Sequence, residues 1–320
     1  MNGAEPDYAI PSAGRNRGIS KGPPSFEFTT SLTQPESDMT QLWCNGQWLD
    51  SHRFTASPTD RGMMLGLGLF ETFLTYEGHV VFADRHLSRL RLACAKLAWD
   101  FSLPDFGKTA NELLVRNNLA VGRARIRLAI TAGSGPLNDL TPGGDRVVCI
   151  TAHPVGIPAD SLTACFSPWP RNERSPLAGM KSASYAENLI ALDHARRQGF
   201  DEVIFFNTIG HLCEASTANL FLVSHGALLT PPLASGCLPG ITREVVIELA
   251  NVLEIPCEER NLLPGDLGHA EEIFLTSSIR GVARLSRFGE HRYDSDHTTQ
   301  VLQRAFQEAV ANDVNSRNST

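Results

Sequence analysis

Only four lysines occur in the chain, and one of them has a sequence setting that could make it a nucleophile. The four are Lys21, Lys96, Lys108 and Lys181. Lys181 lies in the segment "PLAGMKSASY", between a predicted strand and a predicted helix, and its immediate neighbours are uncharged. A lysine amine that is removed from water has a lowered pKa and becomes a usable nucleophile. Taken alone, however, a lysine in a loop is typical of a solvated surface.

Two other segments contain residue types that suit a phosphate group. In "GITREVV", Gly240 precedes a predicted helix that begins near Thr242, and a helix start presents unpaired N–H groups and the positive end of the dipole. The residues Thr276, Ser277 and Ser278 follow a predicted strand directly and offer hydroxyl and N–H groups to the same kind of anion. Each pattern is weak on its own, since many helices begin in this way.

Glu214 is the fourth candidate, a carboxylate in "HLCEASTANLFLV" between two apolar strands. The local sequence alone favours an edge-strand surface glutamate over a functional one.

The sequence motifs of other catalytic and binding sites are absent. The segment "GLGLFE" lacks the third glycine of a dinucleotide fingerprint, and there is no P-loop. The ten histidines lack metal-ligand spacing and the seven cysteines contain no C-x-x-C pair, so we expect no metal site and a reducing, cytoplasmic location.

Composition and charge are those of an ordinary soluble globular protein of about two domains. Apolar residues make up 42% of the 320 residues and charged residues 20%. The net charge of -7 argues against nucleic acid or an anionic membrane surface as the main partner. No apolar run reaches the roughly 18 residues that a membrane-spanning helix needs. We therefore expect a small-molecule substrate.

The first half of the chain predicts a mixed α/β domain over residues 39–155. Asn45-Gly46 and Glu77-Gly78 each lie between apolar runs, which predicts β-hairpins. Helical spacing places Leu87, Leu90, Cys94 and Leu97 on one face of a helix. A second helix is predicted over 107–119, and alternating strands follow up to residue 154.

The second half predicts many short strands and few helices, which favours an α+β or barrel-like domain over residues 163–310, after a linker at 156–162. One helix is expected from about Ser184, ending at Gly199 as a C-cap. A second helix begins near Thr242.

Residues 1–38 are rich in Pro, Gly, Ser and Thr without apolar periodicity. They predict a disordered extension, or an upstream start codon with Met39 as the true start, rather than a targeting segment. Residues 311–320 are expected to be a disordered tail.

Six segments occur in an order that is similar to one known family. They are "RGMMLGLGLFETF", "HLSRL", "KSASYAEN", "EASTANLFLV", "LPGITREVVIELA" and "EEIFLTSSIRG". Together they resemble the class IV aminotransferases, which include branched-chain and D-amino-acid transaminases and 4-amino-4-deoxychorismate lyase. The resemblance covers residues 42–287. It implies an α+β protein of fold type IV, with a small N-terminal α/β domain, a larger C-terminal pseudo-barrel domain, a homodimer, and pyridoxal 5'-phosphate as the cofactor.

The resemblance also implies roles for single residues. Lys181 would carry the cofactor as a Schiff base and move the proton at the substrate Cα. Glu214 would pair with the pyridine nitrogen, which lets the ring act as an electron sink. Arg89 matches the phosphate-binding arginine. Tyr185 lies near the position of a cofactor-contacting tyrosine, one residue short of the branched-chain spacing. The remaining phosphate-binding positions are Ile241, Thr242, Ser277 and Ser278.

The reaction within the family is left open by the sequence. The D-amino-acid subgroup is disfavoured because Leu137 and Asp139 stand where its substrate-binding Arg-x-His element is expected, and Phe70 stands at its tyrosine. The branched-chain element "FEGIR" is replaced by "FETFL". The segments "FETF", "GSG", "TAHP" and "TANLF" look more like aminodeoxychorismate lyases, which release pyruvate and 4-aminobenzoate for folate synthesis. The alternatives are an amino-acid (branched-chain-like) or amine transaminase and, last, a non-catalytic relative.

Overall fold

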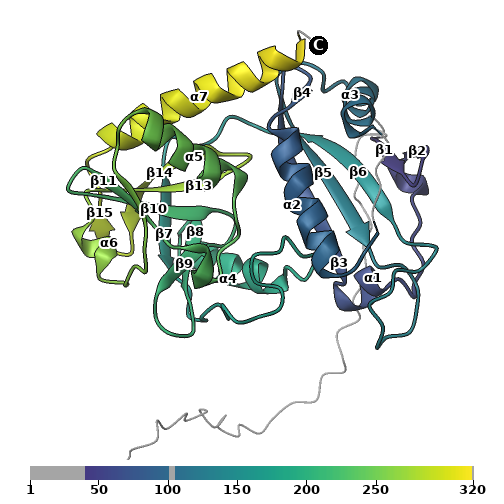
Figure 1. The fold of residues 1–320 in the computed structure, drawn as a ribbon, viewed down its shortest axis with the longest axis horizontal. Coiled ribbons are helices and arrows are strands. Elements are labelled where there is room, and N and C mark those ends of the chain that lie inside the picture. Colours follow the sequence, from purple (N-terminus) through teal and green to yellow (C-terminus); the bar gives the residue numbers. More distant parts are fainter. Residues whose placement is uncertain (1–39, 101–104, 319–320) are drawn as a thin grey trace, which may run out of the picture. The chain divides into compact units, whose positions relative to one another are not determined.

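The computed structural model describes residues 40–100 and 105–318, and these residues are built around two β-sheets (Figure 1). The first sheet has six strands and the second has nine. The chain passes from one to the other between β6 (Val148–Pro154) and β7 (Leu162–Phe166), where the linker was predicted. The expected extension over residues 1–38 lies outside the described residues. Among the described helices, none is long and apolar enough to cross a membrane.

The first sheet is entirely antiparallel, with the strand order β2-β1-β6-β5-β3-β4. Before β6, the elements are β1 Gln41–Cys44, β2 Gln47–Asp50, α1 Arg61–Leu65, β3 Gly68–Tyr76, β4 His79–Val80, α2 Ala83–Lys96, α3 Phe106–Arg116 and β5 Arg123–Thr131. The hairpins predicted at Asn45-Gly46 and Glu77-Gly78 are confirmed. Both residues of each turn have positive φ, as two-residue hairpin turns require. The helix predicted around Leu90 is α2, which packs on this sheet.

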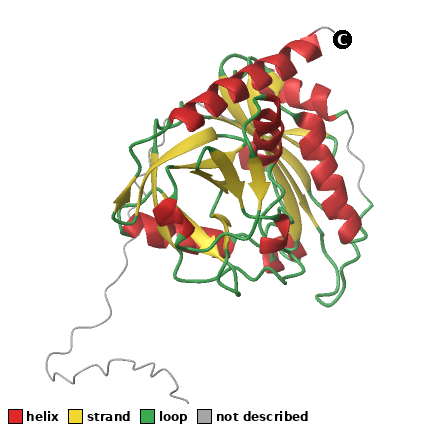
Figure 2. Cartoon of the chain, turned by 60° about the vertical axis from the view of Figure 1, so that its left-hand side comes forward, coloured by secondary structure: helices red, strands yellow, loops and turns green. Residues whose placement is uncertain are grey.

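The second sheet is mixed, with the strand order β12-β11-β10-β13-β14-β7-β8-β9 and β15 paired to β14. After β7, the elements are α4 Ala186–Arg197, β8 Glu202–Phe206, β9 Leu212–Ala215, β10 Asn219–Ser224, β11 Ala227–Thr230, α5 Ile241–Val252, β12 Cys257–Glu259, α6 Asp266–His269, β13 Glu272–Ser277, β14 Gly281–Phe288, β15 His291–Arg292 and α7 His297–Asn318. Figure 2 shows the strands of this sheet curling into a half-barrel. The α+β class predicted from the sequence is confirmed.

The apolar segment "NLFLV" forms β10 because both faces of this strand are buried. Leu220 and Leu222 pack into one apolar cluster, whereas Phe221 and Val223 face a different cluster that includes residues of α5 and α7. A strand that is covered on both faces is apolar at successive positions instead of alternating. Phe221 stacks on Phe274 of β13, with ring centroids 4.9 Å apart. This core fixes the neighbouring ends of β10 and β13, where several candidate residues lie.

The C-terminal tail differs from its prediction, because α7 continues to Asn318 where disorder was expected from residue 311. Val310 and Val314 are buried against the cluster that contains Phe306. The Asp313 carboxylate accepts a hydrogen bond from the Phe82 N–H (2.8 Å). Packing on other elements therefore stabilises a segment whose local sequence is polar.

Candidate active site

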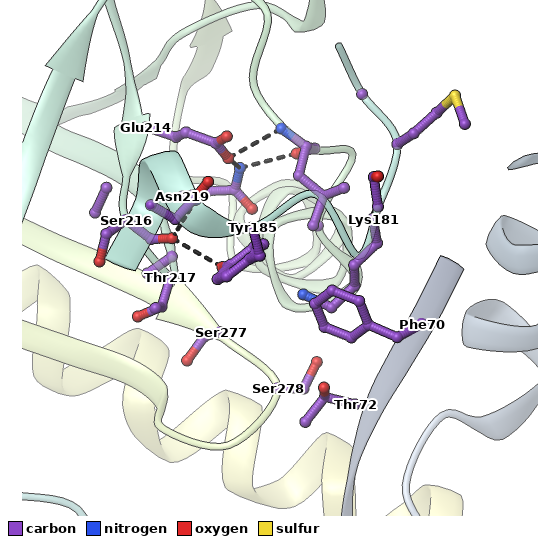
Figure 3. A pocket seen from close by; sticks show the side chains of 18 of the residues that line it. Phe70, Thr72, Lys181, Tyr185, Glu214, Ser216, Thr217, Asn219, Ser277 and Ser278 are labelled. Atoms are coloured by element: carbon purple, nitrogen blue, oxygen red, sulfur yellow. Dashed lines mark hydrogen bonds between the residues drawn. The ribbon is translucent and has the colours of Figure 1, made fainter. Parts of the chain in front are cut away.

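One cavity of about 480 Å³ is lined by every residue that the sequence singled out for the site. These residues are Arg89, Lys181, Tyr185, Glu214, Ile241, Thr242, Ser277 and Ser278. They come from α2, the segment before α4, strand β9, the first turn of α5, and the end of β13 with its following loop. Figure 3 shows Glu214 on one side of Tyr185 and the two serines on the other, with the Lys181 side chain beside the Phe70 ring.

Lys181 is held by backbone pairing with the first sheet. The Phe70 N–H donates to the Lys181 carbonyl (3.0 Å), and the Ala183 N–H donates to the Gly68 carbonyl (2.8 Å). The Lys181 Nζ lies 4.5 Å from the centre of the Phe70 ring. Burial of the amine, with a contribution from the nearby Arg89 guanidinium, lowers the pKa of Lys181 to about 8. The neutral, nucleophilic fraction of this amine near neutral pH is therefore small, but far larger than that of an ordinary lysine.

Glu214 is a buried carboxylate, so the edge-strand surface alternative is wrong. Its Oε2 accepts hydrogen bonds from the Leu238 N–H (2.9 Å) and the Asn219 amide (3.4 Å). Its Oε1 lies 3.4 Å from Nη1 of Arg171. Burial raises the pKa of Glu214, while Arg171 and the Leu238 hydrogen bond oppose this rise. A positively charged ligand group beside Glu214 would find a carboxylate already oriented.

The first turn of α5 forms another side of the cavity. Its N-cap is Gly240, which provides no side-chain cap, so N–H groups of Ile241 and Thr242 have no intrahelical partner. A Cβ atom at Gly240 would overlap the amide oxygen of Asn219. The Oγ1 atom of Thr276 is buried without a hydrogen-bond partner in the part of the chain that the structure describes. Unpaired N–H donors at a helix start, next to unpaired hydroxyl groups, suit a phosphate.

Arg89 is held at the same side of the cavity by a residue that sequence reasoning did not single out. Its Nε and Nη2 donate to the two carboxylate oxygens of Glu71 (2.8 and 2.7 Å), and its Nη1 donates to the Pro239 carbonyl (2.9 Å). Glu71 also contacts Nδ1 of His86 (2.8 Å), and Nε2 of His86 lies 3.3 Å from the Ser278 hydroxyl. Three of the five N–H donors of a guanidinium are thus used, which leaves two for an anion.

Tyr185 lines the cavity, so the shortened spacing from Lys181 does not remove it from the site. Its hydroxyl donates to the Ser216 carbonyl (2.9 Å), and its ring meets the Phe70 ring edge-on at 5.5 Å. Burial raises the pKa of Tyr185 to about 12, with a further contribution from Glu214. The phenol is therefore protonated at neutral pH and can act as a hydrogen-bond donor.

Two cavity arginines that sequence reasoning missed, Arg125 and Arg127, project from alternate positions of β5. The Arg127 guanidinium lies 3.8 Å above the centre of the Phe70 ring. Neither arginine pairs with a carboxylate among the described residues, whereas the other cavity arginines do. The signal was available, because "RARIRLAI" alternates arginine with apolar residues and therefore places its arginines on one face of the strand.

The family model for class IV amino-transferases matches residues 68–288. This chain belongs to the class IV aminotransferase family. It is 33% identical over 250 residues to a putative branched-chain-amino-acid aminotransferase of Methanocaldococcus jannaschii, covering 74% of this chain and 84% of the relative. It is 26% identical over 284 residues to the aminodeoxychorismate lyase of Bacillus subtilis, covering 86% and 97%. The branched-chain aminotransferase of Thermoproteus uzoniensis, solved with norvaline, has a TM-score of 0.79 at 26% identity, covering 85% and 95%.

Members of the class IV aminotransferase family are enzymes that depend on pyridoxal 5'-phosphate, and this is the cofactor of the chain. The cavity suits that molecule. The unpaired N–H groups of α5 and the unpartnered Thr276 hydroxyl complement a phosphate, the partly neutral amine of Lys181 complements an aldehyde, and the buried Glu214 complements a protonated ring nitrogen. Within the described residues, no cluster of His, Cys, Asp and Glu suits a metal ion.

Proposed function

We propose that this enzyme is a 4-amino-4-deoxychorismate lyase, which converts its substrate into 4-aminobenzoate and pyruvate in folate synthesis. The observation that carries the proposal is the pair of unpaired arginines, Arg125 and Arg127, on the cavity wall. The substrate of the lyase carries two carboxylates, and arginine is well suited to bind a carboxylate through a pair of N–H donors. A branched-chain amino acid carries a single carboxylate, so only the dicarboxylate acceptor of a transaminase would engage both arginines.

The roles that the family resemblance implies toward the cofactor are supported by the place of these residues on the cavity wall. Lys181 would carry it covalently, and Glu214 would pair with its ring nitrogen. The first turn of α5 at Ile241 and Thr242 would bind its phosphate through N–H groups, together with Ser277, Ser278 and the free N–H donors of Arg89. Tyr185, whose hydroxyl is fixed by its hydrogen bond to the Ser216 carbonyl, would line the cofactor site through its ring.

For this reaction the protein must remove one proton from the substrate and bind its two carboxylates. The bound cofactor supplies an electron sink at the substrate carbon that bears the amino group. Lys181 takes the proton from that carbon, since its pKa of about 8 leaves part of the amine free to act as a base. The enolpyruvyl group then leaves as the ring becomes aromatic, and regains a proton as pyruvate. The two products together contain all atoms of the substrate, so no keto acid is consumed.

A branched-chain-type transaminase is the second candidate. The identity to the Methanocaldococcus protein, at 33%, exceeds the identity to the Bacillus lyase, at 26%. Phe70 and Met180 also give the cavity some apolar surface. In this case Arg127 would bind the single carboxylate of an amino acid. The enzyme would pass its amino group to a keto acid in two half-reactions.

The experiment that separates these candidates incubates the cofactor-loaded enzyme with 4-amino-4-deoxychorismate and no keto acid. The lyase proposal expects pyruvate and 4-aminobenzoate in equal amounts, over many turnovers. Lys181→Ala is the matched control and should release neither product. If the wild type keeps its cofactor absorption band but releases no pyruvate, the lyase proposal is wrong. Amino-group transfer from leucine or valine to 2-oxoglutarate would then support the second candidate.

We also propose that the enzyme is a homodimer that binds no nucleic acid and no membrane. Large apolar side chains are exposed on α1, where Met63, Met64 and Leu65 are 71%, 50% and 50% accessible. Leu137, in the loop after β5, is 61% accessible. Neighbouring exposed apolar side chains are typical of an interaction surface. Sedimentation equilibrium of the holoenzyme tests this proposal, which a purely monomeric species at micromolar concentration would contradict.

A further inference from the structure

Arg171 is a mostly buried cation whose own hydrogen bonding is incomplete. Its side chain is 16% exposed, and its Nε and Nη2 atoms are buried without a partner in the described part of the chain. Its guanidinium lies 4.4 Å above the centre of the Phe205 ring, and its backbone N–H donates to the Phe206 carbonyl (2.8 Å). Burying a charge with unused donors costs free energy, so such a residue needs a compensating role.

The only carboxylate that pairs with Arg171 within the described residues is Glu214, at 3.4 Å between Nη1 and Oε1. The other oxygen of Glu214 is already occupied by the Leu238 N–H and the Asn219 amide. The titratable and charged groups that face Glu214 are Arg171, Lys181, Arg89, Tyr185, Cys213 and Cys237. Of the cations among them, Arg171 is in direct contact with Glu214 and lowers its pKa most, and Arg89 is already engaged by two hydrogen bonds to Glu71.

We propose that Arg171 is a positioning residue that keeps the Glu214 carboxylate ionised and aimed at the cofactor ring nitrogen. A buried carboxylate without a counter-ion takes up a proton, and a protonated Glu214 can no longer pair with a protonated pyridine nitrogen. The pair at 3.4 Å places this charge on Oε1, while the Leu238 N–H and the Asn219 amide hold Oε2, so the orientation of the whole carboxylate is fixed. The proposal rests on the proposed role of Glu214 and not on the choice between lyase and transaminase.

The test measures the binding of two cofactors to the apoenzyme, without any substrate. One is pyridoxal 5'-phosphate, and the other is its 1-deaza analogue, in which a carbon replaces the ring nitrogen. We expect Arg171→Met to weaken the binding of pyridoxal phosphate at least tenfold more than that of the analogue, since one pKa unit corresponds to about a tenfold change. Arg171→Lys keeps the charge and should retain most of the preference for pyridoxal phosphate.

The preference of the Arg171→Met apoenzyme for pyridoxal phosphate over the analogue should increase with pH. Loss of Arg171 raises the pKa of Glu214 further, so the preference of Arg171→Met for pyridoxal phosphate should be weakest at low pH and should recover as the pH rises. In a Glu214→Gln background, Arg171→Met should cause no further loss of preference, because the carboxylate on which it acts is gone.

An equal loss of affinity for both cofactors at every pH would overturn the proposal and assign Arg171 a purely structural role. An unchanged preference in Arg171→Met would overturn it as well. If Arg171→Met does not fold, Arg171→Gln is used, with the melting temperature of the apoenzyme recorded in parallel. Because no substrate is present, failure of the lyase proposal leaves this result intact.

Discussion

Arg89 and Glu71 form a two-point contact in which Nε and Nη2 of the arginine donate to the two oxygens of the carboxylate at 2.8 and 2.7 Å. The carboxylate belongs to β3 of the first sheet, whereas the third hydrogen bond of Arg89 is to Pro239, just before α5 of the second half. Through Glu71 and Pro239, Arg89 therefore links the first sheet to the segment before α5 at the proposed phosphate site. A second contact between α2 and α5 lies on the exposed surface. There, two N–H groups of Arg85 of α2 donate to the carboxylate of Glu248 of α5 (2.8 Å each).

Glu71→Gln should destabilise the apoenzyme by about 3 kcal/mol, because it leaves Arg89 buried without its charge partner. Burial alone would raise the pKa of Glu71, but Arg89 and His86 bring it down to about 2. A depressed pKa stabilises the fold above the ordinary value of 4.5, and this stabilisation is lost as the pH falls toward 2. The difference between wild type and Glu71→Gln in urea unfolding should thus be full at pH 6 and should shrink below pH 4.5.

The matched control for this prediction is Glu112→Gln, which removes an exposed carboxylate paired with Arg116 on α3. Exposed pairs of this kind contribute little to stability, so the control should unfold almost as the wild type does. A Glu71→Gln variant as stable as this control at pH 6 would show that the pairing of Glu71 with Arg89 contributes nothing to folding.

Capture of the cofactor by the apoenzyme should become faster as the pH rises and should level off above about pH 8. The neutral amine of Lys181 is the reacting form, and burial of this amine together with Arg89 lowers its pKa to about 8. The rate at which the visible absorption band forms, measured between pH 6.5 and 10, reports this pKa. Borohydride reduction followed by peptide mapping should place the cofactor on Lys181. A rate that still rises steeply above pH 9.5 would mean an ordinary, solvated lysine.

Gly240→Ala should weaken binding of pyridoxal phosphate about tenfold or more, because the new Cβ meets the Asn219 amide oxygen and moves either α5 or Asn219. Asn219 bonds to both Glu214 and Leu238, so the disturbance reaches two sides of the cavity. Gly268→Ala is the control, since a Cβ there meets nothing within 4 Å and Gly268 lies on α6, away from the cavity. Equal cofactor affinities of the two variants, measured by titration of the apoenzymes, would contradict the assignment of this helix start.

The local sequence predicted the helices and strands well where the signals for an element lie within the element itself. The hairpin at Asn45-Gly46 and the helix α5 that begins at Ile241 both follow from turn and periodicity signals within a few residues. The C-terminal helix was missed because its last turns depend on Val314 packing against distant residues. The structure also brings Lys181 and Glu214 to one cavity, but the sequence predicted this through a family resemblance and not through local signals.

The supporting residues were missed for a common physical reason. Glu71 is defined as a site residue only by Arg89, which lies 18 positions along the chain, and Arg171 only by Glu214, which lies 43 positions along the chain. Neither has a local pattern that separates it from a surface charge. Arg127 is different, because the alternation in β5 showed its face of the strand, although only the fold shows that this face borders Lys181.

Arg127→Met should raise the KM for 4-amino-4-deoxychorismate by roughly 10-fold to 100-fold, because a hydrogen bond between charged groups contributes about 1.5–3 kcal/mol. The kcat should change less, since Lys181 and Glu214 remain in place. Arg127 is also one of the cations that lower the pKa of the Lys181 amine, so the pH at which cofactor capture by the apoenzyme levels off should shift upward in this variant. Arg91→Met, on the exposed side of α2, is the control and should leave both quantities unchanged. If KM stays the same in Arg127→Met, the unpaired arginine does not hold the substrate, and the argument from charge in favour of the lyase fails.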